Sequence, residues 1–161
     1  MVLDVRGEDE ARDAFRGIER RLREAGHGGE MRSVIVQPMV RDGVEAIVGV
    51  TQDPAFGPII MFGLGGIYVE LLKDVVFRMH PLTDRDAHEM VREVRGYKLL
   101  EGYRGAPPGD VAALEQALLR VSQLFEDHPE IVEMDLNPLK VMPPGHGCVA
   151  VDARVAVRSE A

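Results

Sequence analysis

Tryptophan is absent from this sequence, and cysteine and long apolar runs are scarce. The scarcity of cysteine and of apolar runs argues against a disulfide-stabilised protein and against a membrane-spanning one. The 161 residues include one cysteine, Cys148, which cannot form an internal disulfide and fits a reducing compartment. The longest mostly apolar stretch, residues 57–72, is interrupted by glycines and by Glu70, whereas a membrane helix needs about 20 apolar residues. We therefore expect a cytoplasmic protein without a membrane-spanning segment.

Basic residues are also in deficit. The chain has 19 Lys and Arg against 27 Asp and Glu, a net charge of −8, which argues against a nucleic-acid partner. A phosphate ligand remains compatible, because such a site is local. Hydrophobic residues at 45% and charged residues at 29% are typical of a folded globular chain, so extended disorder is not expected. The five histidines and Cys148 lack the spacing of a zinc site.

Apolar periodicity predicts an α+β fold. Helices are expected to begin after Gly7, at Thr83 and at Asp110, with a short helix at 97–102. Residues 67–79 fit one long strand or a hairpin. Further strands are expected at residues 2–6, 31–37, 44–50, 58–62, 130–141 and 148–157. This order favours a mostly antiparallel sheet with helices packed on one side.

The strand expected at 130–141 carries oxygen-bearing side chains on one face. Because side chains alternate along a strand, Glu133, Asp135 and Asn137 share the face opposite the apolar residues. In one hairpin register Asn137 lies opposite Asp152, whereas a shift by one residue would separate their faces. Such oxygen donors suit Mg²⁺. The exposed face of an ordinary hairpin would show the same pattern, so both interpretations stay open at this point.

Three further features interrupt apolar strands and could contact a ligand. Gly63-Leu64-Gly65-Gly66 could bring backbone N–H groups to a phosphate, or could simply form a tight turn. Glu45 could bind a ligand hydroxyl or lie on an exposed face. Glu70 and Arg78 could act in catalysis or form a structural ion pair.

Taken together, several segments in the same order resemble one known family. They are VIVQPMV, GVEAIVGVTQDPAFGPIIMFGLGGIYVELLKDVVFRMHPL, LLEGYRGAPP, VSQLFEDHPEIVEMDLNPLKV and CVAVDAR. This text resembles the ATP-grasp part of the NDP-forming acyl-CoA synthetases, also called acetate–CoA ligases (ADP-forming). That family is related to the β subunit of succinyl-CoA synthetase. The match covers nearly the whole chain and is therefore far more specific than any single motif.

The resemblance implies a role for each feature, with ATP or ADP and Mg²⁺ as cofactors. Glu45 would bind the ribose hydroxyls, and Glu70 and Arg78 would act near the phosphates. Asn137 and Asp152 would be the Mg²⁺ ligands, with Asp135 as the companion acidic residue. The other implied nucleotide contacts are the hinge residues Gln37, Pro38, Met39 and Val40, which would meet the adenine, and the loop residues Gly63, Gly65 and Gly66.

The resemblance also implies that residues 1–161 form only part of a larger machine. It identifies them as the second, C-terminal lobe of an ATP-grasp domain, with the first lobe, its phosphate-binding lysine and the phosphorylated histidine absent. A protein partner would then supply that lobe and the CoA-binding and ligase domains, and the chain alone would be inactive. The alternative is a non-catalytic nucleotide-binding or regulatory module, as in ATP-grasp-containing protein acetyltransferases. The uncovered apolar surface would favour self-association.

Overall fold

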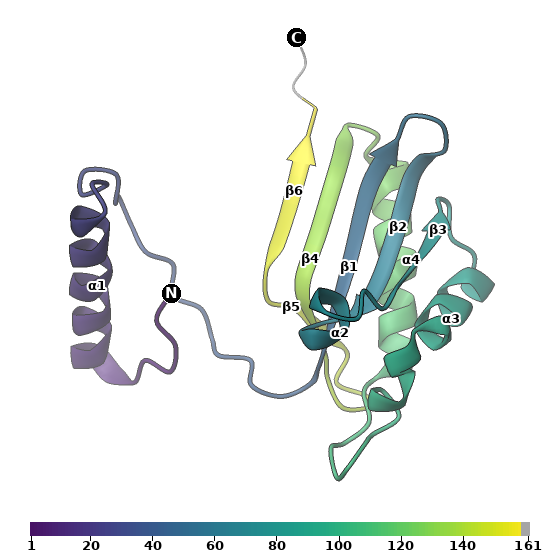
Figure 1. Ribbon diagram of the computed structural model, residues 1–161, viewed down its shortest axis with the longest axis horizontal. Helices are drawn as coiled ribbons and strands as arrows, with labels where there is room; N and C mark the ends of the chain where they lie inside the picture. The colour runs from purple at the N-terminus through teal and green to yellow at the C-terminus, as the bar shows by residue number, and fades with distance from the viewer. Residues whose placement is uncertain (159–161) are drawn as a thin grey trace. The chain divides into compact units, whose positions relative to one another are not determined.

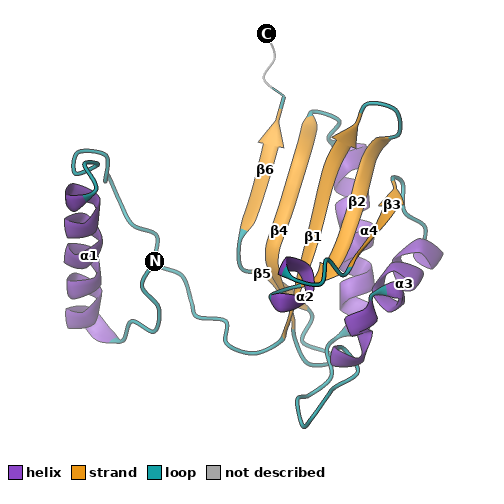
Figure 2. Cartoon of the chain, viewed as in Figure 1, coloured by secondary structure: helices purple, strands orange, loops and turns teal. Residues whose placement is uncertain are grey.

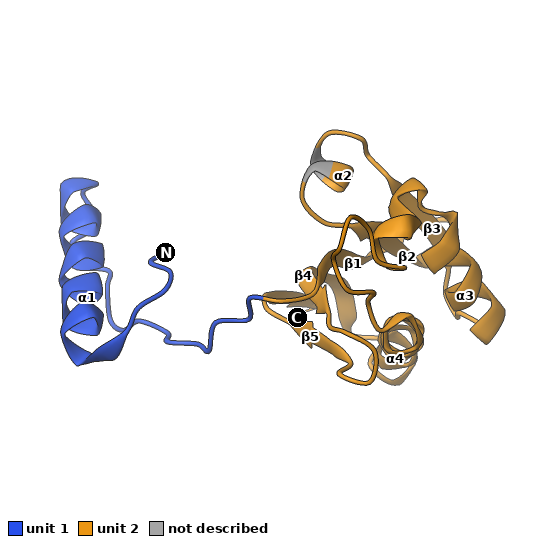
Figure 3. Cartoon of the chain, turned by 90° about the horizontal axis from the view of Figure 1, so that it is seen from below, with its two compact units in different colours: residues 1–41 blue, residues 42–161 orange. Residues whose placement is uncertain are grey.

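The chain folds into two compact units. The computed structural model describes residues 1–158, apart from the side chains of Ile67 and Glu70. The first unit is Met1–Arg41 and the second is Asp42–Ala161, coloured blue and orange in Figure 3. Each unit is described by itself below. None of the helices in the described part is long and apolar enough to cross a membrane.

The first unit contains one helix and no strand among its residues. Helix α1 (Gly7–Glu24) forms as expected, with acidic residues in its first turn and basic residues in its last, as the helix dipole favours. The strands expected at 2–6 and 31–37 were wrong, because both segments are irregular. A strand is stable only when its backbone groups pair with another strand, and no residue of this unit offers that pairing. Ile35 consequently stays 87% exposed.

The second unit is built on a six-stranded sheet in which every pairing is antiparallel (Figure 1). The strand order is β3-β2-β1-β4, and β5 and β6 both pair with β4 on its other side. Their bounds are β1 (Val44–Asp53), β2 (Gly57–Leu64), β3 (Val75–Met79), β4 (Ile131–Val141), β5 (Cys148–Ala150) and β6 (Ala153–Val157). The expected α+β class with a mostly antiparallel sheet is confirmed.

Two helices cover one face of this sheet (Figure 2). They are α3 (Asp84–Glu93) and α4 (Val111–Asp127), and their apolar sides join the sheet in a single core. Central members of that core are Val48, Ile60, Phe62, Met90, Leu114, Leu118 and Val141. We call the opposite side of the sheet the open face. The helices are therefore packed on one side, as predicted.

The predicted helix starts at Thr83 and Asp110 are confirmed. Thr83 and Asp86 form a capping box at α3, since the Thr83 hydroxyl accepts from the Asp86 N–H and the Asp86 carboxylate accepts from the Thr83 N–H. At α4 the Asp110 carboxylate accepts from the N–H of Ala113. Each cap satisfies a backbone donor that the first helical turn leaves unpaired.

Three predicted elements differ in form from what the chain adopts. Residues 67–79 are neither one strand nor a hairpin: helix α2 (Ile67–Glu70) follows Gly66, and β3 begins at Val75. Gly66 has φ +62°, which turns the chain out of the strand direction. The short helix expected at 97–102 is a 3-10 helix, η1 (Arg95–Leu99). The final strand is divided into β5 and β6.

Candidate functional site

Glu45 lies on the open face between two other strands. Alternation along β1 buries Ala46, Val48 and Val50 in the core and turns Glu45 the other way, as predicted. On one side Lys140 of β4 is its register partner, and the Lys140 Nζ lies 3.0 Å from Glu45 Oε1. On the other side the N–H of Gly65 donates to the Glu45 carbonyl oxygen at 2.7 Å. The carboxylate remains 47% exposed.

Each glycine of the loop after β2 has a structural reason of its own. A Cβ on Gly65 would lie 2.8 Å from Glu45 Cβ, and one on Gly63 would lie 2.8 Å from Val75 Cγ1. Gly66 instead adopts a positive φ. The tight turn is therefore real, and the N–H of Gly65 is already paired. Phosphate binding by Gly63, Gly65 and Gly66 stays a prediction.

Of the two hairpin registers that the sequence left open, the structure adopts the one that places Asn137 opposite Asp152. Leu139 pairs with Ala150 and Leu136 with Ala153, so Asn137 stands opposite Asp152. The Asn137 N–H donates to the Asp152 carbonyl oxygen at 3.1 Å. Both residues are exposed, and Asp135, two residues earlier on β4, is half-buried.

The side-chain oxygens of Asp135, Asn137 and Asp152 could hold Mg²⁺ only together with oxygen atoms from a bound ligand. Among the described residues no group of three His, Cys, Asp or Glu side chains is close enough to hold a metal ion alone. Mg²⁺ in nucleotide sites is commonly held by one or two protein oxygens together with phosphate oxygens and waters. Asp135, Asn137 and Asp152 match that donor chemistry, and their binding of the ion stays a prediction.

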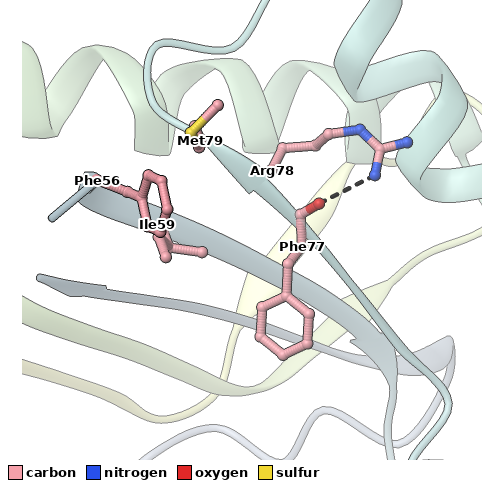
Figure 4. A pocket seen from close by; sticks show the side chains of 5 residues that line it. All are labelled: Phe56, Ile59, Phe77, Arg78 and Met79. Atoms are coloured by element: carbon pink, nitrogen blue, oxygen red, sulfur yellow. Dashed lines mark hydrogen bonds between the residues drawn. The ribbon is translucent and has the colours of Figure 1, made fainter. Parts of the chain in front are cut away.

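Arg78 lies apart from this group. It is the register partner of the core residue Ile60, so its side chain leaves the sheet on the helix-covered side. Its guanidinium pairs with Glu93 of α3 at 2.5 Å and donates to the Phe77 carbonyl oxygen (Figure 4). The structure thus gives Arg78 a structural ion pair, on the opposite face from Glu45. The side chain of Glu70 lies outside the described residues.

The predicted hinge belongs to the first unit. Gln37, Pro38 and Met39 line a cavity of about 470 Å³ together with residues of α1 such as Phe15, and Val40 is half-buried. Glu45 and the metal-ligand candidates belong to the second unit. Their joint contact with one nucleotide therefore stays a prediction.

Two polar residues of this region were missed from the sequence. Lys140 reaches Glu45 only through the β1–β4 register, which no local pattern reveals. Asp74 is 7% exposed and accepts from the N–H groups of Arg95 and Gly96, at 2.9 Å each. A buried carboxylate with two backbone donors fixes the segment between the glycine loop and β3 against η1.

Comparison with known proteins assigns the family. Residues 1–157 match the ATP-grasp domain family. The chain is 50% identical over 158 residues to acetate–CoA ligase [ADP-forming] I of Archaeoglobus fulgidus, covering 96% of this chain and 22% of that protein. It is 43% identical over 159 residues to the acetate–CoA ligase [ADP-forming] II subunit beta of Pyrococcus furiosus, covering 98% of this chain and 67% of that subunit.

Solved structures agree with this assignment. The CoA complex of ACD1 from Candidatus Korarchaeum cryptofilum has a TM-score of 0.88 and 43% identity, covering 98% of this chain and 67% of that one. A second complex from that organism, an acetyl-CoA synthetase with CoA and Mg-AMPPCP, has a TM-score of 0.83, 43% identity and the same coverage. Its phosphohistidine segment points towards the nucleotide-binding site. This chain thus spans about a fifth of the Archaeoglobus ligase and two thirds of the beta subunits. It belongs to the ATP-grasp family, as the beta-subunit-like ATP-grasp domain of an ADP-forming acetyl-CoA synthetase.

Proposed function

We propose that the chain supplies the nucleotide- and Mg²⁺-binding part of an ADP-forming acyl-CoA synthetase. The reaction converts acyl-CoA, ADP and phosphate reversibly into the free acid, CoA and ATP. The phosphoryl group would be carried by a phosphohistidine segment outside this chain, like the one in the Korarchaeum complex. The CoA-binding and ligase domains would likewise come from a partner or from further segments.

Each candidate residue has a defined part in this proposal. The Glu45 carboxylate accepts hydrogen bonds from the ribose hydroxyls, and Gln37 to Val40 meet the adenine. Asn137 and Asp152, with Asp135 beside them, offer oxygen atoms to Mg²⁺. Bound there, Mg²⁺ would neutralise charge on the phosphates during transfer. Gly63, Gly65 and Gly66 form the loop that lies along the phosphates.

One observation carries the proposal: the candidates gather on the open face of the central strands. Glu45 of β1, Gly65 after β2, and Asp135 and Asn137 of β4 come from three adjacent strands. The Mg-AMPPCP complex of a relative with 43% identity supports a nucleotide with Mg²⁺ as the ligand. Arg78 has no part in this arrangement, because its partner Glu93 holds it on the other face.

Calorimetric titration with Mg-ADP tests the proposal. We expect saturable one-to-one binding by the chain and binding about tenfold weaker in Glu45→Gln, since a neutral acceptor replaces the charged one. Arg78→Gln is the matched control and should bind as the unmodified chain does. Absence of Mg-ADP binding by the unmodified chain would overturn the nucleotide assignment.

A further inference from the structure

Lys140 and Glu45 form an ion pair on the open face, and the two side chains differ in their exposure to solvent. The Lys140 side chain is 13% exposed, whereas the Glu45 side chain is 47% exposed. An ammonium group withdrawn from water is unfavourable unless a charged partner accepts from it. The 3.0 Å contact to Glu45 Oε1 provides that partner. The less exposed Lys140 therefore holds the carboxylate, while the carboxylate itself stays open to a ligand.

The contact with Lys140 occupies one carboxylate oxygen of Glu45 and leaves the other able to accept from a ligand. Oε1 accepts from Lys140, and an ionised carboxylate has further acceptor positions on Oε2. Gly65 limits the other side, because its N–H donates to the Glu45 carbonyl oxygen and a Cβ at its position would lie 2.8 Å from Glu45 Cβ. A glutamate on an exposed strand would ordinarily sample several rotamers. Here Lys140 of β4 and Gly65 after β2 lie on either side of Glu45 and restrict the rotamers of its side chain.

Lys140 does not have the exposure of a phosphate ligand. Its Nζ lies 3.0 Å from Glu45 Oε1, and its side chain is only 13% exposed. A lysine that neutralises phosphates would need a free ammonium reaching into the site. The geometry instead favours a positioning role, in which Lys140 acts on the ligand only through Glu45.

We propose that Lys140 is a positioning residue that fixes Glu45 for recognition of the ribose hydroxyls and so sets the preference for ribonucleotides. The inference rests on the proposed function. Without the ammonium, Glu45 would lose its fixed rotamer. Affinity would then fall only for ligands that form hydrogen bonds with the carboxylate. Preorganised polar groups gain affinity because no ordering remains to be done on binding.

Calorimetry with two ligands tests this role. Mg-ADP and Mg-2′,3′-dideoxy-ADP, which lacks both ribose hydroxyls, are titrated into the unmodified chain and into Lys140→Met. We expect the unmodified chain to prefer ADP by about tenfold or more. Lys140→Met should lose most of that preference, with dideoxy-ADP affinity unchanged within about twofold. Lys140→Arg, which keeps the charge, should restore part of it.

Controls separate this role from a purely structural one. Lys98→Met removes an equal charge from the exposed surface of η1 and should keep the full preference. Thermal unfolding establishes that each variant is folded, and Lys140→Gln replaces Lys140→Met if that variant unfolds. If Glu45→Gln loses the ribose preference but the Lys140 variants retain it, the positioning role is overturned and the proposed function stands. If the unmodified chain binds neither ligand, both fail together. If it binds both ligands equally, the positioning role is overturned and nucleotide binding stands.

Discussion

At the scale of single residues, the pair Asn137 and Asp152 carries the metal hypothesis. Both are exposed and stand opposite each other, so their side chains contribute little to packing. We expect Asn137→Ala and Asp152→Ala each to weaken Mg-ADP binding by about tenfold, because a metal ligand is removed. The thermal unfolding midpoint should change little, as is usual for exposed positions.

Titration with ADP in EDTA is the control for this prediction. The two variants should match the unmodified chain there, since their effect depends on Mg²⁺. Equal affinity of all three proteins for Mg-ADP would show that Asn137 and Asp152 are ordinary surface residues of a hairpin.

Asp110 is a residue whose protonation should affect stability. Its carboxylate accepts from the N–H groups of Gly147 at 3.0 Å, Ala113 at 3.1 Å and Gly145 at 2.8 Å, and these bonds lower its pKa. A folded-state pKa below the unfolded value means that the stabilisation is present above about pH 4 and is lost as pH falls through the folded pKa. Asp110 thereby joins the start of α4 to the loop between β4 and β5.

Urea unfolding across pH checks this expectation. The free energy of unfolding should fall as the pH drops below about 4 in the unmodified chain. Asp110→Asn should be less stable at pH 7 and should show a shallower fall over the same range. Identical pH profiles for the two proteins would remove Asp110 as a contributor.

At the scale of elements, the close approach of β2 and β3 depends on Gly63. A Cβ there would lie 2.8 Å from Val75 Cγ1 and 2.9 Å from the Asp74 carbonyl oxygen. The backbone oxygen cannot move without disturbing the β2–β3 pairing, so Gly63→Ala should lower the free energy of unfolding by about 1–3 kcal/mol. Gly49→Ala on β1 is the control, because its nearest neighbour is the flexible Met61 side chain at 3.3 Å. Chemical denaturation of both variants measures the difference, and equal stability would contradict the argument.

Local alternation and capping made most of the second unit predictable. The Glu45 face of β1 and the caps at Thr83 and Asp110 follow from the sequence because they depend on neighbouring residues. The sequence left the hairpin register open, and the structure shows that Asn137 stands opposite Asp152. The Lys140–Glu45 contact does not follow from the sequence, since it depends on which strand lies beside β1. The Arg78–Glu93 ion pair was missed for the same reason, since it depends on a helix packed against the sheet.

The first unit shows a structural feature that composition failed to predict. Residues 31–37 have the composition of a strand, and composition alone cannot provide the partner that a strand needs. This segment is therefore irregular because residues 1–41 contain no strand with which it could pair. Apolar side chains of this segment, such as Val36, consequently stay exposed.

At the scale of the whole molecule, catalysis should require parts that this chain does not contain. The chain spans about a fifth of the single-chain Archaeoglobus ligase. We expect the isolated chain to form no ATP from acetyl-CoA, ADP and phosphate, because phosphoryl transfer needs the histidine segment and the CoA-binding domains. A coupled assay for ATP measures this, and steady turnover by the isolated chain would refute it.

A chimera distinguishes a competent part from a non-catalytic module. In it, the matching 158 residues of the Archaeoglobus ligase, which are 50% identical, are replaced by this chain. If the open face binds Mg-nucleotide for catalysis, the chimera should form ATP, and Asn137→Ala within it should lower the rate by about tenfold or more. Arg78→Gln within the chimera is the matched control, since Arg78 lies on the other face of the sheet. A folded chimera that binds CoA but forms no ATP would favour the regulatory alternative over the ligase.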